Sequence, residues 1–530
     1  MKIIIVGGGV SGWMTAAHLS TFNQDVDITV IESPRIPGIQ VGESVTPHVS
    51  AFFNDLNIPT HEWMKGTGAV YKLGNKFVNW SHGKGEEEYF SFTFTNPIDN
   101  YLKDIYQPQD LMDFRPRKHN SGERSIDHVG EMLRQGTIDK YDQYAHSQYH
   151  YMCKNVAPFN GNTKLLNQPW SLTHHINAEL TGKFLRDTVA LPNGVNHILS
   201  EVVDLKYVDD TIQELILENG EIVTGDLFVD ATGFHRRLIN ALGWEKVHYD
   251  YPIDSAWVCQ TEYVNQDKEM LNYTNSIAEP AGWRFNIGLY HRMGNGYCFS
   301  SKYVSDEDAL AHLKKQLTNP IKLGPKLIKW KPSRLKDFAR GNVISIGLSS
   351  GFIEPMEANL LYITIFSIRS LSNIIKRGTI NWDKLNQEMT WSFDDVYDFL
   401  LAHYTLTNRD DTPFWKDMKE WGQRHGHIQK AIDKTNAVKN SVFNSLAGKN
   451  LFPDYMWQQL VSAWGHSPER ELDPKLHELA KHSVISSEKK HDIITNMLEN
   501  NYQWHKTAVY DNLICEDWAK KYIKTGKTND

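Results

Sequence analysis

Long apolar runs that end in glycine recur along this chain and indicate its architecture. The first, residues 2–6, is unbroken and rich in β-branched side chains, which is typical of a strand buried on both faces. A glycine-rich segment follows at residues 7–12, and residues 13–19 continue with a helix-compatible sequence. A second apolar run, residues 26–31, ends in Glu32. This order predicts strand, glycine turn, helix and parallel strand.

Two later apolar runs repeat the pattern of a strand that ends in glycine. Residues 227–230 lead to Gly233, and residues 343–346 lead to Gly347. Before the turn at Gly233, apolar and polar side chains alternate over residues 202–217 on either side of an Asp-Asp turn. This pattern predicts a β-meander. Three such turns spread widely along the chain favour a flavoprotein over a compact NAD dehydrogenase domain.

Helical patterns dominate the last third of the chain. They cover residues 361–375, 382–405 and 414–434. Earlier, Asn177 is placed to cap a helix over residues 178–185. We therefore expect an α/β fold with α+β lobes rather than a single sheet.

The organisation predicted from these patterns has three parts. A discontinuous nucleotide-binding module, Rossmann-like, is expected at residues 1–81 and 171–385. Residues 82–170, polar and aromatic without a clear period, are interpreted as an insertion that contributes to the substrate side. Residues 386–530 are expected to be mainly helical.

Charge and cysteine usage narrow the class of protein. Across 530 residues, 56 basic and 64 acidic side chains give a formal net charge of −8, which argues against a nucleic-acid-binding protein. Four dispersed cysteines, no Cys-x-x-Cys pair and no secretory segment before the first strand fit a reducing cytoplasm. No apolar run approaches the roughly 20 residues of a membrane span, so we expect a soluble protein without a membrane partner. We also expect no metal site.

The first glycine segment carries the residue types that nucleotide binding needs. Gly7 permits a tight turn, Gly9 lets the backbone approach phosphates, and Gly12 lets helix and strand pack closely. A pyrophosphate would lie on the helix N-terminus, with Glu32 expected to bind a ribose hydroxyl. Glycines also close ordinary turns, but the flanking strand, helix and acid favour an FAD or NAD site. A second segment, Gly42-Glu43-Ser44, either brings backbone against the cofactor or begins a capped helix.

Several motifs between residue 1 and about residue 415 belong together. They are GxGxxG at 7–12, VGES at 41–44, KFVNW at 76–80, LFVDATGF at 227–234, IGLSSGFIEPME at 346–357, HY at 403–404 and RDDTPFW at 409–415. In this combination the chain resembles the flavin-dependent halogenases of the tryptophan halogenase family, which share the architecture of single-component FAD monooxygenases. KFVNW together with EPME is the narrowest part of the resemblance.

The resemblance implies a chemistry and a set of cofactors. In the family, FADH2 and O2 form a flavin hydroperoxide, a halide ion attacks it, and the resulting hypohalous acid travels through a tunnel to an electron-rich aromatic substrate. Reduced flavin would come from a separate NAD(P)H-dependent flavin reductase, and a homo-oligomer is possible. The residues that the resemblance places at the cofactor are Gly7, Gly9, Val10, Ser11, Gly12, Trp13, Glu32, Val41, Gly42, Glu43, Ser44, Val203, Asp230, Gly233, Leu348 and Leu361.

Two residues match the catalytic positions of the family. Lys76 matches the lysine that holds and polarises hypohalous acid, and Glu357 matches the glutamate beside the halogenated carbon. Each has a plainer interpretation. Lysines are nearly always solvated surface residues, and a glutamate after Pro355 suits a helix N-terminus.

Two stretches depart from the family pattern. The stretch usually reading WxWxIP is here Trp283-Arg284-Phe285-Asn286-Ile287-Gly288, so the barrier between substrate and flavin is expected to be looser, although these side chains also suit one buried strand face. After Glu357 the usual Ser-Thr-Gly is Ala358-Asn359-Leu360, and leucine cannot replace glycine's conformations. The residues expected at the halide and tunnel are Asn359, Leu360, Ser350, Trp283 and Phe285. We hypothesise a preference for bromide or iodide over chloride.

Alternatives to a halogenase stay open at this point. A flavin monooxygenase that hydroxylates an aromatic or reduces a prenyl chain would use the same nucleotide module, and a catalytically silent flavoprotein would keep the fold without turnover. The substrate is expected to be an indole, a phenol or another electron-rich arene. The late region around residues 443–464 contains Phe452, Tyr455, Trp457 and Trp464 but does not match the family's grip on free tryptophan.

Overall fold

The computed structural model describes most of the chain in two compact units. The described residues are 1–23, 25–36, 42–83, 88–91, 125–145, 148–157, 159–160, 164–165, 173–437, 451–452, 454–469, 474, 477–478, 481 and 498–510. Unit 1 comprises Met1–Val70, His174–Val258 and Lys326–Tyr397, and unit 2 comprises Tyr71–Thr173, Cys259–Pro325 and Asp398–Asp530. This division differs from the predicted boundaries because it places residues 71–81 and 259–325 together in unit 2.

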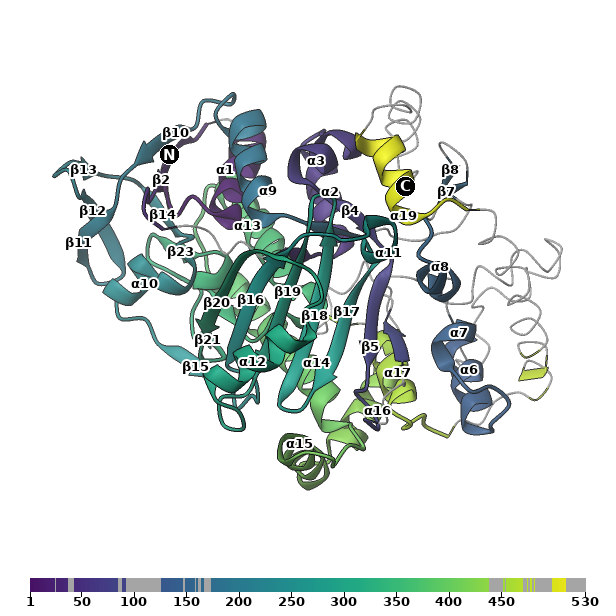
Figure 1. The fold of residues 1–530 in the computed structure, drawn as a ribbon. Helices are drawn as coiled ribbons and strands as arrows, with labels where there is room; N and C mark the ends of the chain where they lie inside the picture. The colour runs from purple at the N-terminus through teal and green to yellow at the C-terminus, as the bar shows by residue number, and fades with distance from the viewer. Residues whose placement is uncertain are drawn as a thin grey trace. The chain divides into compact units, whose positions relative to one another are not determined.

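Unit 1 is built on a six-stranded, mostly parallel sheet with the order β10-β2-β1-β14-β23-β22 (Figure 1). Its strands are β1 (Lys2–Val6), β2 (Asp27–Glu32), β10 (Asn196–Leu199), β14 (Leu227–Asp230), β22 (Ala339–Arg340) and β23 (Val343–Ser345). The predicted runs form the central strands β1, β2, β14 and β23, and Ile3, Ile4 and Ile5 are fully buried. The α/β fold with a Rossmann-like module is therefore confirmed.

Helices and small sheets complete unit 1. Helix α1 (Val10–Phe22) contacts α9 (Ala178–Leu185) and α13 (Asn359–Arg377). The side-chain oxygen of Asn177 accepts hydrogen bonds from the amides of Glu179 and Leu180, so the predicted cap is confirmed. The other elements are α2 (Pro47–Asp55), α3 (Thr60–Thr67), α10 (Arg237–Ala241), β3 (Glu43–Ser44), β15 (Lys246–His248), β21 (Ser333–Leu335) and β24 (Gly351–Phe352).

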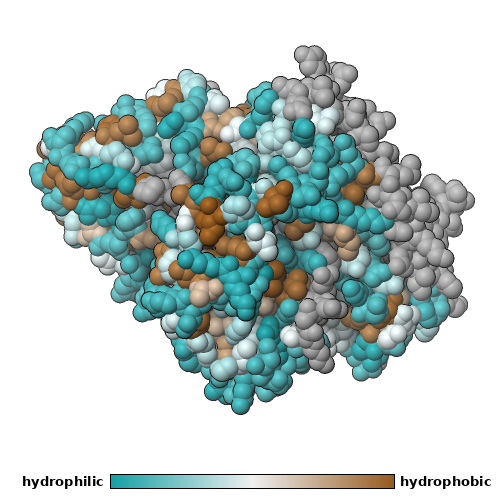
Figure 2. All heavy atoms as spheres, in the orientation of Figure 1, coloured by the Kyte–Doolittle hydropathy of each residue, from teal (hydrophilic) through white to brown (hydrophobic). Residues whose placement is uncertain are grey.

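The predicted meander is also present in unit 1. It consists of β11 (Val202–Val208), β12 (Thr211–Leu217) and β13 (Ile222–Val223). Several of its apolar side chains are exposed, among them Val203, Val208 and Ile222, and Figure 2 shows brown apolar surface over this meander. The predicted cofactor residue Val203 is therefore about half exposed, at 48%.

Unit 2 contains most of a seven-stranded sheet with the order β20-β16-β19-β18-β17-β5-β6. The strands are β5 (Gly74–Val78), β6 (Glu88–Ser91), β16 (Ser255–Thr261), β17 (Tyr273–Glu279), β18 (Gly282–Leu289), β19 (Arg292–Phe299) and β20 (Ile321–Lys329). Strand β5 runs parallel to β17 and antiparallel to β6. Lys76 therefore lies on an inner strand of the sheet.

The helices of the last third follow the prediction with one correction. Helix α14 (Asp383–Thr405) forms as expected, but the single helix predicted for residues 414–434 is two helices, α15 (Pro413–Arg424) and α16 (His427–Ala437). The break falls at Gly426, whose φ of 62° is left-handed and cannot continue a helix. Other described helices are α6 (Ser125–Arg134), α7 (Tyr141–Ala145), α8 (Gln148–Lys154), α12 (Asp306–Gln316), α17 (Asp454–Ala463) and α19 (Asn501–His505).

One described helix, Met356–Arg377, is long and apolar enough by length and composition to cross a membrane. The expectation that no segment approaches a membrane span is wrong in this respect. However, 56% of its most apolar window is buried, and α13 contacts α1 and α2. These contacts are those of a core helix of unit 1.

Candidate active site

The first glycine turn has the shape that a dinucleotide pyrophosphate needs. Gly7 has a φ of +119°, and a Cβ there would lie 2.3 Å from the carbonyl oxygen of Ala231. Helix α1 begins at Gly9 without a side-chain cap, and a Cβ on Gly9 would meet no atom within 4 Å. The start of α1 therefore has free space beside Gly9 and no side-chain cap, which fits a bound phosphate.

Glu32 lies beside this turn, as predicted. It ends β2, and a Cβ on Gly8 would lie 2.2 Å from the Glu32 Cδ atom. The Glu32 Oε2 atom is 2.9 Å from Nε2 of His197. Trp13, by contrast, is buried at 1% exposure with its ring edge-on to His197, so it fills the core next to the predicted site.

The second glycine turn is held by Asp230. The Oδ1 atom of Asp230 accepts from the amide of Thr232 at 3.0 Å and its hydroxyl at 2.7 Å, and Oδ2 accepts from the amides of Leu238 and Ile239. All four donors belong to the chain itself, so this carboxylate positions the turn at Gly233, whose φ is +65°.

The third glycine turn lies against the other two. Gly347 has a φ of +79°, and a Cβ there would lie 2.3 Å from Oγ of Ser11, at the start of α1. Ser349 Oγ is 2.5 Å from the carbonyl oxygen of Asp230. Leu348 lies between them and is partly buried. The structure thus brings three turns together at the carboxyl ends of neighbouring parallel strands, where α/β proteins bind nucleotides.

Asp230→Asn is expected to destabilise unit 1. The amide nitrogen of asparagine would face buried donors instead of accepting from them, so we expect a loss of about 2 kcal/mol and a melting temperature lower by several degrees. Thermal unfolding followed by circular dichroism measures this. Asp226→Asn is the control, because Asp226 is exposed and accepts only from the amide of Lys2 among its described contacts. Equal melting temperatures for the two variants would contradict the role of Asp230.

The second motif forms a short strand. Val41 lies outside the described residues. Glu43 and Ser44 form β3, which pairs with β9 (Thr173–Ile176), whereas α2 begins later with Thr46 at its N-cap. The capped-helix interpretation of Gly42-Glu43-Ser44 is therefore wrong. Burial raises the pKa of Glu43 to about 7.

Glu357 sits on a left-handed backbone next to this strand. β3 contacts the 3-10 turn η4 (Met356–Ala358) that contains Glu357. Glu357 is 7% exposed with a φ of 63°, and Ala358 follows with a φ of 57°. Two consecutive left-handed residues without glycine are unusual and strained, which is typical of functional sites. Glu357 lies in the 3-10 turn that leads directly into α13, which is the place near a helix N-terminus that the plainer interpretation names.

The predicted halide residues of unit 1 lie in two places, at the start of α13 and in the third glycine turn. Asn359 donates its side-chain amide to the Met356 carbonyl at 2.9 Å, and Leu360 lies in the first turn of α13 without a left-handed φ. Ala358 offers no side-chain cap to α13. Ser350 is fully buried and donates to the Ser345 carbonyl at 2.9 Å, and Leu361 is buried.

Lys76 lies in unit 2, on β5 opposite Asn275 of β17. Its side chain is partly buried, and Nζ lies 5.9 Å from the centroid of the Tyr273 ring. Lys76 is therefore neither the fully solvated lysine of the plainer interpretation nor a fully buried one. Lys72, four residues earlier, is the more deeply buried lysine, at 1% exposure.

An aromatic cluster follows Lys76. The Trp80 ring lies 5.6 Å from that of Phe77 and 6.3 Å from that of Trp283. Trp283 and Phe285 are 2% and 5% exposed on β18, as the buried-strand interpretation expected. His403, Tyr404, Trp415 and Trp464 surround Trp80 within the same unit.

Several residues of these sites were missed from the sequence. Glu279 at the end of β17 accepts from Arg284 Nε at 3.0 Å and lies 2.8 Å from His312 Nε2. In unit 1, the hydroxyl of Tyr251 hydrogen-bonds to Glu354, three residues before Glu357. The opposite charges of Glu279 and Arg284, on either side of the turn at residues 280–282, were a sequence signal for their ion pair. The sequence carries no comparable signal for the hydrogen bond between Tyr251 and Glu354. Within the described residues, no group of three histidine, cysteine or acidic side chains could hold a metal ion.

Comparisons with known proteins agree with this geometry. The profile described as "Tryptophan halogenase" matches residues 2–481. The chain is 31% identical over 457 residues to tryptophan 7-halogenase RebH of Lentzea aerocolonigenes, covering 82% of each protein. It is 33% identical to 7-chloro-L-tryptophan 6-halogenase KtzR of Kutzneria sp. (strain 744), covering 79% of this chain and 81% of that protein.

A solved structure supports the same assignment. BrvH, a flavin-dependent halogenase from Brevundimonas sp. BAL3, superimposes with a TM-score of 0.81 at 25% identity, covering 96% of this chain and 99% of that one. Because the family profile spans most of the sequence and curated relatives exceed 30% identity over about four fifths of it, this chain belongs to the tryptophan halogenase family and is a flavin-dependent halogenase.

Proposed function

We propose that the protein halogenates an electron-rich aromatic compound with hypohalous acid that Lys76 holds in place. The observation that carries this proposal is the setting of Lys76, which is partly buried on an inner strand with an aromatic ring near its ammonium. Reduced FAD, when bound, supplies two of the four electrons that O2 takes up, and halide supplies the other two, which gives oxidised FAD, water and hypohalous acid.

Unit 1 offers a place for that cofactor. The uncapped start of α1 and the open space at Gly9 suit the pyrophosphate, and Glu32 beside the turn suits a ribose hydroxyl. The turns at Gly233 and Gly347 close around the start of α1, and Glu43 and Ser44 on β3 extend the site toward Glu357.

Lys76 and Glu357 divide the remaining chemistry. The Lys76 ammonium donates a hydrogen bond to the oxygen of hypohalous acid and gives it a proton as the oxygen–halogen bond breaks, so that water leaves. The halogen forms its new bond to a ring carbon. The carboxylate of Glu357 stabilises the resulting cation and accepts the ring proton.

The halide preference rests on the start of α13. Its first amides have no side-chain cap, so they suit an anion. Leu360 occupies the position where the family carries glycine, and its side chain changes the pocket. We propose that bromide or iodide, which lose water more easily, react in preference to chloride.

The substrate proposed is an indole or a phenol. The two relatives above are named for tryptophan and for 7-chloro-L-tryptophan, which both contain an indole, and these names support an indole substrate. In this chain, Phe452 stacks on Phe399, Trp457 packs edge-on to Phe399, and the indole of Trp464 donates to the His403 carbonyl. These buried aromatics fill the core of unit 2, so we do not propose that they grip free tryptophan. A separate flavin reductase in the cytoplasm would supply FADH2.

A panel of substrates tests the proposal. The protein is mixed with FAD, a flavin reductase, NADH, O2 and equimolar chloride, bromide and iodide, together with indoles, tryptophan and phenols. Products are identified by accurate mass, and the isotope pattern distinguishes chlorine from bromine. We expect halogenated arene in which bromine or iodine predominates. Chlorinated product in majority would contradict the halide preference. Hydroxylated product without halide dependence would indicate a monooxygenase, and no oxidised arene would indicate a silent flavoprotein.

A further inference from the structure

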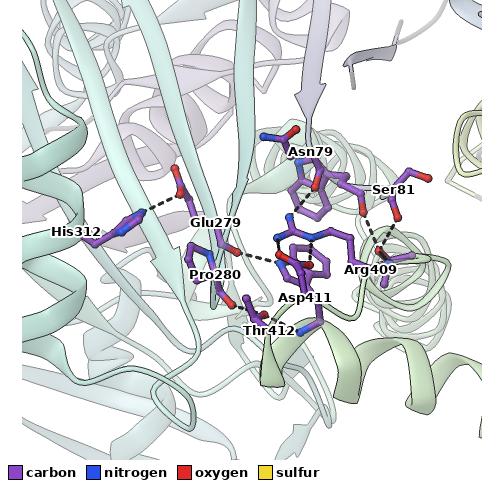
Figure 3. Close-up of polar contacts among 11 residues, drawn as sticks. Asn79, Ser81, Glu279, Pro280, His312, Arg409, Asp411 and Thr412 are labelled. Atoms are coloured by element: carbon purple, nitrogen blue, oxygen red, sulfur yellow. Dashed lines mark hydrogen bonds and ion pairs between the residues drawn. The ribbon is translucent and has the colours of Figure 1, made fainter. Parts of the chain in front are cut away.

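The segment at residues 407–415 has no role in the reaction proposed above, yet it surrounds the turn that follows the Lys76 strand (Figure 3). Arg409 is only 5% exposed, and its Nη1 atom donates to the Asn79 carbonyl at 2.6 Å. Its Nε and Nη2 atoms donate to the two carboxylate oxygens of Asp411 at 2.8 and 2.7 Å. The guanidinium lies 4.5 Å from the centroid of the Trp415 ring. Each part of this buried cation therefore has a defined contact.

The same segment holds the next two residues of the turn. The hydroxyl of Thr407 donates to the Trp80 carbonyl at 2.8 Å, and the amide of Asn408 donates to the Ser81 carbonyl at 2.9 Å. Three successive carbonyls after β5 thus receive hydrogen bonds from three successive residues. We call Thr407, Arg409, Asp411 and Trp415 the Arg409 clamp.

The clamp also holds the neighbouring strand. The indole of Trp415 donates to the Glu279 carbonyl at 3.0 Å, and Thr412 beside it donates to the Pro280 carbonyl at 2.8 Å. Glu279 ends β17, the strand that pairs with β5 and carries Tyr273, whose ring faces the Lys76 ammonium. One segment therefore fixes the ends of both strands that define the surroundings of Lys76.

The clamp contacts the chain just past the end of β5. Asn79 has a φ of 63°, a left-handed conformation that asparagine adopts more readily than other residues apart from glycine. The strand ends at Val78, two residues after Lys76, and Asn79 follows it. A bidentate Arg–carboxylate pair whose guanidinium is buried has the rigid, planar geometry that can keep such a turn in one conformation.

We propose that Arg409 is a positioning residue for Lys76, and that it keeps the ammonium where it captures hypohalous acid. This inference rests on the proposed function of Lys76. Because misplacing a reacting group by about 1 Å lowers rates strongly, loosening the turn separates halide oxidation from halogen transfer. If Arg409 had a purely structural role, its substitution would lower stability without changing the fraction of hypohalous acid that reacts with the arene.

The test is Arg409→Lys, which keeps the charge but lacks the planar fork needed to bond Asn79 and both Asp411 oxygens together. Reactions contain bromide, an indole and an excess of a 1,3-diketone that traps free hypobromous acid. We expect the ratio of brominated indole to brominated trap to fall about tenfold, with total bromine transferred per FADH2 unchanged. Hydrogen exchange of the flavin-free protein should be several-fold faster in peptides covering residues 74–83 and unchanged in those of β1 and β14.

The same substitution in a Lys76→Met background shows whether Arg409 acts through Lys76. We expect no further fall in the ratio there, because the positioned group is gone. A second tenfold fall would overturn the inference. So would an unchanged ratio for Arg409→Lys alone, provided that Lys76→Met lowers it. If wild type brominates nothing, the proposed function fails instead.

A matched control comes from helix α15, next to this segment. Lys419 donates to the Asn408 carbonyl at 3.1 Å and to Asp410 Oδ2 at 2.9 Å, and neither bond reaches residues 79–81, so Lys419→Met should keep the wild-type ratio. Thr407→Val removes the hydroxyl bonded to the Trp80 carbonyl, and we expect it to lower the ratio of brominated indole to brominated trap as Arg409→Lys does. If the arginine variant does not fold, this variant is the test of the inference.

Discussion

Lys76→Met is expected to lower arene halogenation at least about a hundredfold, the loss typical of removing a donor aimed at a reacting oxygen. Methionine preserves the length and packing of the side chain but removes the ammonium, so hypohalous acid would still form and would escape to solvent. FAD affinity should stay within about twofold of wild type, because methionine preserves the packing of the side chain and leaves the glycine turns unaltered. Product mass and trapped hypohalous acid measure the two effects.

Lys302→Met is the matched control. Lys302 is also in unit 2 and also lies over a tyrosine ring, that of Tyr303, at 4.7 Å, but its side chain is exposed. We expect this variant to halogenate at the wild-type rate. Because Lys72 is buried more deeply than Lys76, Lys72→Met is worth measuring beside them. If Lys72→Met released hypohalous acid and Lys76→Met did not, the role of the ammonium would belong to Lys72.

Glu357→Gln is expected to lower kcat about a hundredfold while leaving FAD affinity unchanged. Glutamine keeps the size and the left-handed backbone of the residue but cannot accept the ring proton or stabilise the cation as a carboxylate does. Loss of the proton should then limit the rate. With substrate deuterated at the reacting carbon, we expect a kinetic isotope effect in the variant and none in wild type.

Glu354→Gln serves as the comparison within the same segment. Glu354 is also buried, and its partner Tyr251 donates a hydrogen bond that an amide oxygen still accepts. This variant should react without an isotope effect. If both variants lost activity equally and neither showed an isotope effect, Glu357 would have a structural role only.

The nucleotide-binding part of the fold was predictable because its signals are local. Strand β1, the turn at Gly7 and helix α1 are adjacent in sequence, and each residue's conformation follows from its own side chain and near neighbours. The meander around Asp209 and the cap at Asn177 were predictable for the same reason. The split between α15 and α16 at Gly426 was missed because one glycine inside a helical pattern is often tolerated.

The setting of Lys76 was not predictable in this way. Its strand pairs with Asn275 of β17 about 200 residues later, and parallel pairing leaves no local turn to reveal it. The left-handed backbone of Glu357 lies beside β3, and no residue type at that position indicates it. Motif resemblance named Lys76 and Glu357, but their surroundings came only from the structure.

The interleaving of the two units has a consequence for synthesis of the chain. Neither unit is contiguous, and Arg409 lies 330 residues after Asn79, to which it donates. At roughly 5 to 20 residues per second, the ribosome needs on the order of 20 to 60 s to make that stretch. Throughout that interval the nascent strand β5 exists without its clamp, and β17 joins it only after most of unit 1 has emerged. Chaperone availability during translation should therefore limit the yield of active protein more than the final stability does.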